Sequence, residues 1–376
     1  MTSRNVALAA LAAVLAVPTW LQLNADADTF VDLARVPRMF EGFTTDNVGA
    51  VLLAVPKADQ PEQPAPDAAA GAAGSAAGQI AYDQLVLQRF DGGWRIGQLG
   101  DAPNELAGAP VMTSRVDNDV FEHLRTIRSD PETLVQPNAT DEQLAQYGLD
   151  DAHAMLIRTT DKGGRGIVAE ILVGSDAGTG QVGTEAVRGV FVRQRQSRDV
   201  VLYEWQKPWR RDIDVTRWLD RTLLRVEPDR VRRLSIRNAA SGSKTFVFAR
   251  GLNRASFEAE SGADDLGALR QTEIEGLVQR FRYLAVQAYE RPLARAGDMS
   301  ALGLFPPQVA IELDVASGEN GSGEIRKIQL HIGRRVAGRN EFYASCSESE
   351  FLLTLSPAIV TQFELDTAQR LFDPKK

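Results

Sequence analysis

The densest cluster of residues able to bind a ligand lies between positions 205 and 221. Tryptophan rings stack on sugars and cations, and arginines pair with phosphate or carboxylate groups. Such a surface would hold a glycan or place arginines against anionic lipid headgroups. The alternative is packing, in which Trp209 and Trp218 attach a short helix to a sheet edge and the arginines stay in solvent. The candidate ligand or partner surface consists of Trp205, Trp209, Arg210, Arg211, Trp218 and Arg221.

A second chemical candidate is the glycine-rich stretch between positions 174 and 183. Backbone amides of a glycine-rich loop cradle phosphates when Gly-Lys-Ser/Thr or a dinucleotide-binding helix follows immediately. Here the next ordered segment is a predicted strand, residues 189–193. We therefore expect a flexible hairpin loop at these glycines instead of a nucleotide site.

Residue types that perform catalysis are scattered along the chain. Cys346 is the only cysteine and lies in a predicted strand, so we expect a buried, inert thiol and no internal disulfide. His123, His153 and His331 show no HExxH or HxH spacing, and the sequence predicts no metal site. We expect no catalytic residue, no cofactor and no enzymatic activity. The enzyme alternative is a glycan hydrolase whose paired carboxylates come from distant segments.

The composition indicates how many domains the chain can form and which class of partner it excludes. A chain of 376 residues with 44% hydrophobic and 24% charged residues can build two ordinary globular domains. The net charge of −8 argues against nucleic acid as a partner, because nucleic-acid-binding proteins present a basic face.

The N-terminal segment predicts export. Residues 6–23 carry no charge, and as a helix they would span about 27 Å, close to the thickness of a hydrocarbon core. Arg4 precedes this run and acidic residues follow it, which places the N-terminus in the cytoplasm and the body outside. We expect a single-pass anchor within residues 1–30. The alternative is a signal peptide cleaved near Ala27, which would release the body to the periplasm.

The body repeats one pattern twice. Tyr147-Gly148-Leu149 and Leu302-Gly303-Leu304 each introduce a series of alternating apolar strands, and each follows a hairpin region and a helix. The pattern predicts an α+β fold of two pseudo-repeated units, each an antiparallel β-rich meander with one or two packed helices, behind an N-terminal transmembrane helix. The expected units are residues 31–225, with a disordered insertion at 56–80 that is rich in Pro, Ala and Gly, and residues 226–376.

Local signals place the elements of these units. An Asp-Gly turn at 91–92 predicts a hairpin of residues 84–96. Apolar spacing predicts helices over 115–129 and 266–284, and Thr140 with Gln143 predicts a capping box that opens a helix at 141–147.

Several phrases together resemble the DUF4340 family, a bacterial family of unknown function. They are Tyr147 to Asp151, Leu172-Val173-Gly174, Val190 to Arg193, Val201-Leu202-Tyr203 and Trp218 to Leu224. Ala152 stands where the family has proline, and Leu219 replaces the first arginine of its Trp-Arg-Asp-Arg phrase. The resemblance implies a membrane anchor and a β-rich extracytoplasmic body at the bacterial inner membrane. It also implies a partner, because family members often sit beside components of gliding-motility-type ABC transport systems.

Three functional hypotheses follow. The first is a non-enzymatic, membrane-tethered extracytoplasmic module that binds an envelope protein, accessory to an ABC-type transport complex. The second is a glycan- or lipid-binding protein that uses the surface at 205–221. The third is the carboxylate-based hydrolase.

Overall fold

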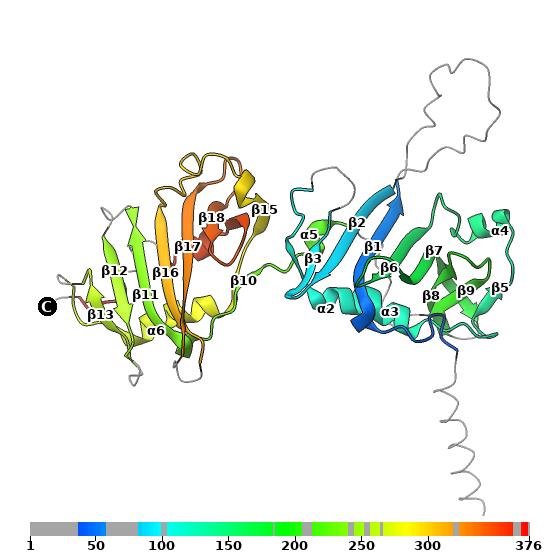
Figure 1. The fold of residues 1–376 in the computed structure, drawn as a ribbon, viewed down its shortest axis with the longest axis horizontal. Helices are drawn as coiled ribbons and strands as arrows, with labels where there is room; N and C mark the ends of the chain where they lie inside the picture. The colour runs from blue at the N-terminus through cyan, green and yellow to red at the C-terminus, as the bar shows by residue number, and fades with distance from the viewer. Residues whose placement is uncertain are drawn as a thin grey trace, which may run out of the picture. The chain divides into compact units, whose positions relative to one another are not determined.

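The computed structural model describes residues 37–57, 82–98, 104–182, 185–204, 213–239, 244–251, 256–263, 266–318, 323–363 and 370–374. The predicted anchor and nearly all of the predicted insertion lie outside these residues. The described part is rich in strands with few helices, and its strands pair antiparallel (Figure 1). Within it, no helix combines the length and apolar character needed to cross a membrane.

The chain divides into two compact units. One consists of residues 1–89 with 113–213, and the other of residues 90–112 with 214–376. The segment 90–112 belongs to the second unit because the backbone at 110–112 bonds to residues 218–220. The amide of Met112 donates to the carbonyl oxygen of Trp218 at 2.8 Å, and the amide of Asp220 donates to that of Pro110 at 2.9 Å.

The first sheet has nine strands in the order β4-β3-β2-β1-β6-β7-β8-β9-β5. Its interior strand β1 pairs with β2, the next strand along the chain, and with β6 across a long sequence separation. The predicted hairpin is confirmed, with the Asp-Gly turn between β2 and β3. The strands are β1 (Val48–Pro56), β2 (Tyr82–Phe90), β3 (Gly93–Ile96), β4 (Pro110–Val111), β5 (Leu134–Gln136), β6 (Met155–Asp161), β7 (Ile167–Val182), β8 (Glu185–Gln194) and β9 (Val200–Glu204).

The second sheet has eight strands in the order β13-β12-β11-β16-β17-β18-β19-β15, and a separate pair joins β10 to β14. The strands are β10 (Thr222–Leu224), β11 (Val231–Asn238), β12 (Thr245–Ala249), β13 (Glu258–Ser261), β14 (Leu284–Ala285), β15 (Ala288–Pro292), β16 (Val309–Ala316), β17 (Ile325–Arg335), β18 (Phe342–Cys346) and β19 (Phe351–Leu355).

The two sheets share one strand order. Each strand of the second sheet has a counterpart at the same place in the first sheet, and only the short β4 has none. The counterparts of β1, β2 and β3 are β11, β12 and β13. The counterpart of β5 is β15, and those of β6 to β9 are β16 to β19. In both, a helical segment separates the first three strands from the rest of the sheet. The repeated phrases of the sequence therefore correspond to a repeated topology.

The helices bury the apolar stripes seen in the sequence. In the first unit the helical run begins at Thr113 and ends at Thr126. In the second unit it begins at Gln271 and ends at Tyr283. This second run begins later than the predicted residue 266, because Leu269 forms a β-bridge to Phe372. The predicted capping box of α4 is confirmed. The helical elements are η1 (Thr45–Asn47), α2 (Thr113–Val116), η2 (Asp117–Phe121), α3 (Glu122–Thr126), α4 (Asp141–Gln146), α5 (Val215–Trp218), η3 (Pro228–Arg230), α6 (Gln271–Gln279), η5 (Arg280–Tyr283), η6 (Leu293–Arg295) and α7 (Pro357–Val360).

The repeated Gly-Leu phrase forms the same backbone corner in each sheet. Gly148 has φ +63° and Gly303 has φ +69°, left-handed values that favour glycine. The amide of Ser175 donates to the carbonyl oxygen of Tyr147 at 2.8 Å. In the second sheet, the amide of Arg334 donates to the carbonyl oxygen of Leu302 at 2.9 Å. The phrase is therefore a structural corner that bonds to the middle of β7 in the first sheet and to the end of β17 in the second.

The glycine-rich stretch is not the loop that the sequence predicted. β7 continues to Val182 and pairs with β8 at Gly180↔Val187 and Val182↔Glu185. Glycine weakens a strand but leaves its backbone able to pair, so the cross-strand hydrogen bonds carry the hairpin through these positions.

Candidate functional site

The predicted ligand surface is only partly within the described structure. Trp205, Trp209, Arg210 and Arg211 lie outside the described residues. Trp218 is only 3% exposed, whereas Arg221 is exposed. The ring of Trp218 is thus buried, so the ring itself is not offered to a sugar or a lipid.

The backbone around Trp218 indicates a packing role. Asp214 caps α5 by accepting from the amide of Thr216 at 3.0 Å, and this hydrogen bond with the Thr216 hydroxyl holds the pKa of Asp214 below its usual value. After α5, Leu219 forms a bridge to Val111 of β4. The arrangement matches the packing alternative for Trp218, in which the tryptophan attaches a short helix to a sheet edge.

Asp220 next to this helix is also structural. Its carboxylate pairs with Arg225 at 3.2 Å, and it accepts from the amide of Thr222 at 2.9 Å. The Tyr289 hydroxyl donates to the Asp220 carbonyl oxygen at 2.8 Å. Burial, followed by the nearby charge of Asp220, strongly raises the pKa of Tyr289, which therefore stays protonated as a donor and does not act as a base.

A polar cavity of about 460 Å³ lies beside Tyr289 in the second compact unit. Arg95 and the loop Ser347 to Glu350 line it, together with the ring of Phe351. Arg95 donates to the carbonyl oxygen of Gly108 at 3.2 Å, so part of its charge already serves the fold.

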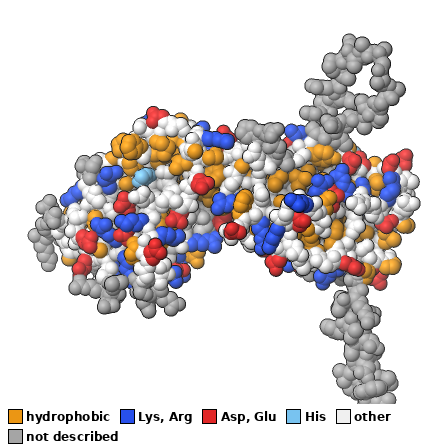
Figure 2. All heavy atoms as spheres, viewed as in Figure 1, with side chains coloured by type: hydrophobic (Ala, Val, Ile, Leu, Met, Phe, Trp, Pro, Cys, Tyr) orange, Lys and Arg blue, Asp and Glu red, His pale blue; other side chains and the backbone are white. Residues whose placement is uncertain are grey.

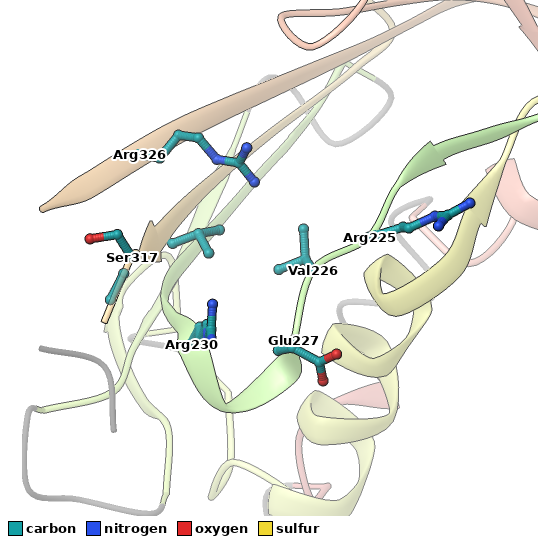
Figure 3. A pocket seen from close by; sticks show the side chains of 8 residues that line it. Arg225, Val226, Glu227, Arg230, Ser317 and Arg326 are labelled. Carbon is teal, nitrogen blue, oxygen red and sulfur yellow. The ribbon is translucent and has the colours of Figure 1, made fainter. Parts of the chain in front are cut away.

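A second cavity, of about 320 Å³, lies between η3 and the ends of β16 and β17 (Figure 3). Its apolar wall contains Val226, Val315 and Ala316, all buried. The guanidinium groups of Arg230 and Arg326 are directed into it, while Arg225 and Glu227 point away (Figure 3). Sequence reasoning missed this site, because no local motif links Arg230 to a residue on β17.

The contacts of each described histidine and of the cysteine follow from their places in the fold. His123 is buried against the Tyr203 hydroxyl at 3.1 Å, and His153 contacts the Asp150 carboxylate at 2.7 Å. His331 is half-buried on β17, where burial and then Arg237 lower its pKa and favour the neutral ring. Burial raises the pKa of Cys346 to about 11. Among the described residues, no group of three or more His, Cys, Asp or Glu side chains is placed to hold a metal ion.

The surface mixes charges and carries one apolar sheet edge. Figure 2 shows acidic and basic side chains interspersed over the face in view. At one end of the first sheet, β5 pairs with β9 alone among the described strands, and it exposes Leu134 (37%) and Val135 (40%). Exposed apolar residues on an edge strand are unusual, because edges are normally protected from pairing with other chains.

Comparison with known proteins gives one finding. The model of the family described as Domain of unknown function (DUF4340) matches residues 104–307, more than half of the chain. This match confirms the resemblance drawn from the repeated phrases. No curated protein and no solved structure matches the chain.

Proposed function

Because the chain belongs to the DUF4340 family, we propose that it is a non-enzymatic, membrane-tethered extracytoplasmic module that binds an envelope protein, accessory to an ABC-type transport complex. In this proposal the uncharged run at residues 6–23 is the anchor, and a duplicated β-rich unit forms the body. The shared strand order of the two sheets supports the duplication.

The observation that carries partner binding is the contrast among the sheet edges. β13 places Glu258 and Glu260 on one edge, and β15 ends at Pro292. Charge and proline both discourage a further strand. β5 has neither in its three residues and presents Leu134 and Val135 instead.

An exposed edge of this kind binds an extended segment by strand addition, here through the backbone groups other than the Leu134 amide, which already donates to the carbonyl oxygen of Asp130 at 3.1 Å. Backbone hydrogen bonds supply affinity, and alternate side chains supply specificity. Because β5 is only three residues long, the partner segment is expected to be short and apolar, and the contact to be strengthened by tethering of both proteins to one membrane.

Site-specific photo-crosslinking in cells tests the proposal. A photoreactive residue at Val135 of the full-length chain is expected to capture an envelope protein, and the same residue at Glu258 on the charged edge is the matched control. Deletion of residues 6–23 should abolish the capture, because the tether is lost. Equal yields at Val135 and Glu258, or recovery of the chain alone, would refute the proposal.

A pair of charge substitutions provides the second arm. Leu134→Glu with Val135→Glu should leave the unfolding temperature nearly unchanged, because both side chains are exposed. The same variant should no longer co-purify with the crosslinked protein. Retained co-purification would place the contact elsewhere on the chain.

A further inference from the structure

The arginine-lined cavity of Figure 3 has the chemistry of a small-anion site. It is built from two regions far apart in the sequence: the stretch from Arg225 through η3, and the hairpin that joins the end of β16 to the start of β17. These segments meet because β11, which follows η3, pairs with β16, and β16 pairs with β17. The cavity is therefore fixed by sheet register, which makes its arginines a preorganised pair.

Two guanidinium groups are available to a ligand there. Within the part of the chain that the structure describes, the Arg230 side chain makes no hydrogen bond or ion pair. Arg326 contacts Glu348 at 3.3 Å, but both side chains are substantially exposed, so water weakens this pair and a stronger anion can displace the carboxylate. Both groups are directed into the hollow.

The acidic group of the cavity does not oppose an anion. Glu227 points away from the hollow and pairs with Arg282 at 3.6 Å. Arg225 points away too and pairs with Asp220 at 3.2 Å. The charge directed inward is thus cationic, although the chain as a whole carries −8.

The apolar part of the lining lies beside the arginines, since Val315 is the cross-strand partner of Arg326. Val226 is held in place by its amide, which donates to the carbonyl oxygen of Phe281 at 3.1 Å, and Val315 and Ala316 complete the surface. A volume of about 320 Å³ is at the lower end of small-molecule sites. A ligand that fits must be compact, with an anionic head and a short apolar part.

We propose that this cavity binds a phosphate monoester, with the phosphate held between Arg230 and Arg326 and the ester carbon chain against Val226. Guanidinium groups bind phosphate oxygens through paired hydrogen bonds, which a single lysine does not reproduce. A soluble phosphomonoester and the headgroup of an anionic lipid share this chemistry. The inference does not rest on partner binding at β5, so either can fail without the other.

Calorimetric titration of the full-length chain in mild detergent tests the site. Monobutyl phosphate is expected to bind about tenfold or more tightly than inorganic phosphate, because the butyl group leaves water for the apolar wall. Arg230→Ala and Arg326→Ala should each raise the dissociation constant about tenfold or more. Arg326→Lys should recover part of that loss.

Arg233→Ala is the matched control, because Arg233 follows on β11 but pairs with Glu260 instead of facing the cavity. It should bind as the wild type does. Circular dichroism should show every variant folded, since the substituted arginines are partly exposed. No heat with any probe, or equal weakening by Arg233→Ala, would overturn the site, and equal binding of monobutyl and inorganic phosphate would overturn its apolar part.

Short-chain dihexanoyl phosphatidic acid distinguishes the two sources of the ligand. Tighter binding of this lipid than of monobutyl phosphate, lost in Arg230→Ala, supports the site as one for a lipid headgroup. Tighter binding of monobutyl phosphate supports it as one for a soluble ester.

Discussion

The repeated corner makes a quantitative prediction about two glycines outside the Gly-Leu phrases. Gly174 and Gly333 lie against the corners, where a Cβ atom would be 2.3 Å from the carbonyl oxygen of Tyr147 or of Leu302. Substitution of either glycine by alanine therefore forces the corner backbone to move. We expect Gly174→Ala and Gly333→Ala to destabilise the protein by similar amounts, because the two corners share one geometry.

The size of the effect follows from the contacts. Since carbon contacts are optimal at about 3.5–4.0 Å, the corner must shift by about 1 Å, and overpacking of this kind costs about 1–3 kcal/mol. The shift also weakens the bond from Ser175 or Arg334 to the same carbonyl oxygen, worth about 1 kcal/mol. Alanine also lowers the conformational entropy of the unfolded chain relative to glycine, which offsets the loss by about 0.4–1 kcal/mol. The net expected loss is about 1–3 kcal/mol in the free energy of unfolding.

Thermal unfolding of the full-length chain, followed by circular dichroism, measures this loss. For a unit of about 200 residues, it corresponds to a fall in Tm of about 2–12 °C. Gly276→Ala is the control, because Gly276 lies in α6 with no atom within 4 Å of its added Cβ. Removing a helical glycine should instead stabilise by up to about 1 kcal/mol.

Two outcomes would contradict this reasoning. A Tm of Gly174→Ala within about 1 °C of the wild type would show that the corner yields without cost. A large loss at Gly174 with none at Gly333 would show that the corners are not equivalent.

Three further predictions concern residues near the candidate sites. Trp218→Ala should lower the free energy of unfolding by about 3–5 kcal/mol, as for other buried large aromatics, measured by urea denaturation; a loss below about 1 kcal/mol would contradict a packing role. The pKa of Asp214 is lower in the folded protein than its ordinary value of 3.8. The ionised Asp214 carboxylate therefore stabilises the fold at any pH above 3.8, and this stabilisation is lost as the pH falls through the folded pKa. Asp214→Ala should remove this contribution to acid unfolding and lower the free energy of unfolding by about 0.5–1 kcal/mol at neutral pH. Cys346 should react with a thiol reagent at pH 8 only after unfolding, because burial raises its pKa to about 11; rapid labelling of the folded chain would show that the thiol is accessible.

The sequence predicted what depends on neighbouring residues. The Asp-Gly turn, the capping box at Thr140 and the apolar stripe through Phe121 and Leu124 are local patterns, and the structure contains all of them. The repeated phrases predicted recurring strands because each sheet reuses the same corner. Alternation of apolar residues was enough to find most strands.

Features that depend on how distant strands pair could not be predicted from the sequence. The stretch around Gly180 looked like a loop because its composition is poor for a strand, yet pairing with Val187 continues the hairpin. Arg230 and Arg326 meet only because two successive strand pairings bring their segments together. Packing of Trp218 at a sheet edge was one of the two interpretations of the sequence, but which edge it packs against follows from the pairing of its segment with residues 111–112.

The position of β1 inside its sheet, between β2 and β6, has a consequence for folding order. Leu52 pairs with Arg158, about 100 residues later, so at about 5–20 residues per second one edge of the β1–β2 hairpin stays open for about 5–20 s during synthesis. Strand β6 nevertheless emerges before any strand of the second sheet, so β1 meets its own partner before the equivalent strand β16 has been made. Refolding from urea removes this order and presents β6 and β16 together to two similar open edges. We therefore expect a smaller folded fraction after refolding of the full-length protein from urea than after its synthesis in a cell-free translation system. Equal fractions would show that the two strand edges select their own partners without the order of synthesis.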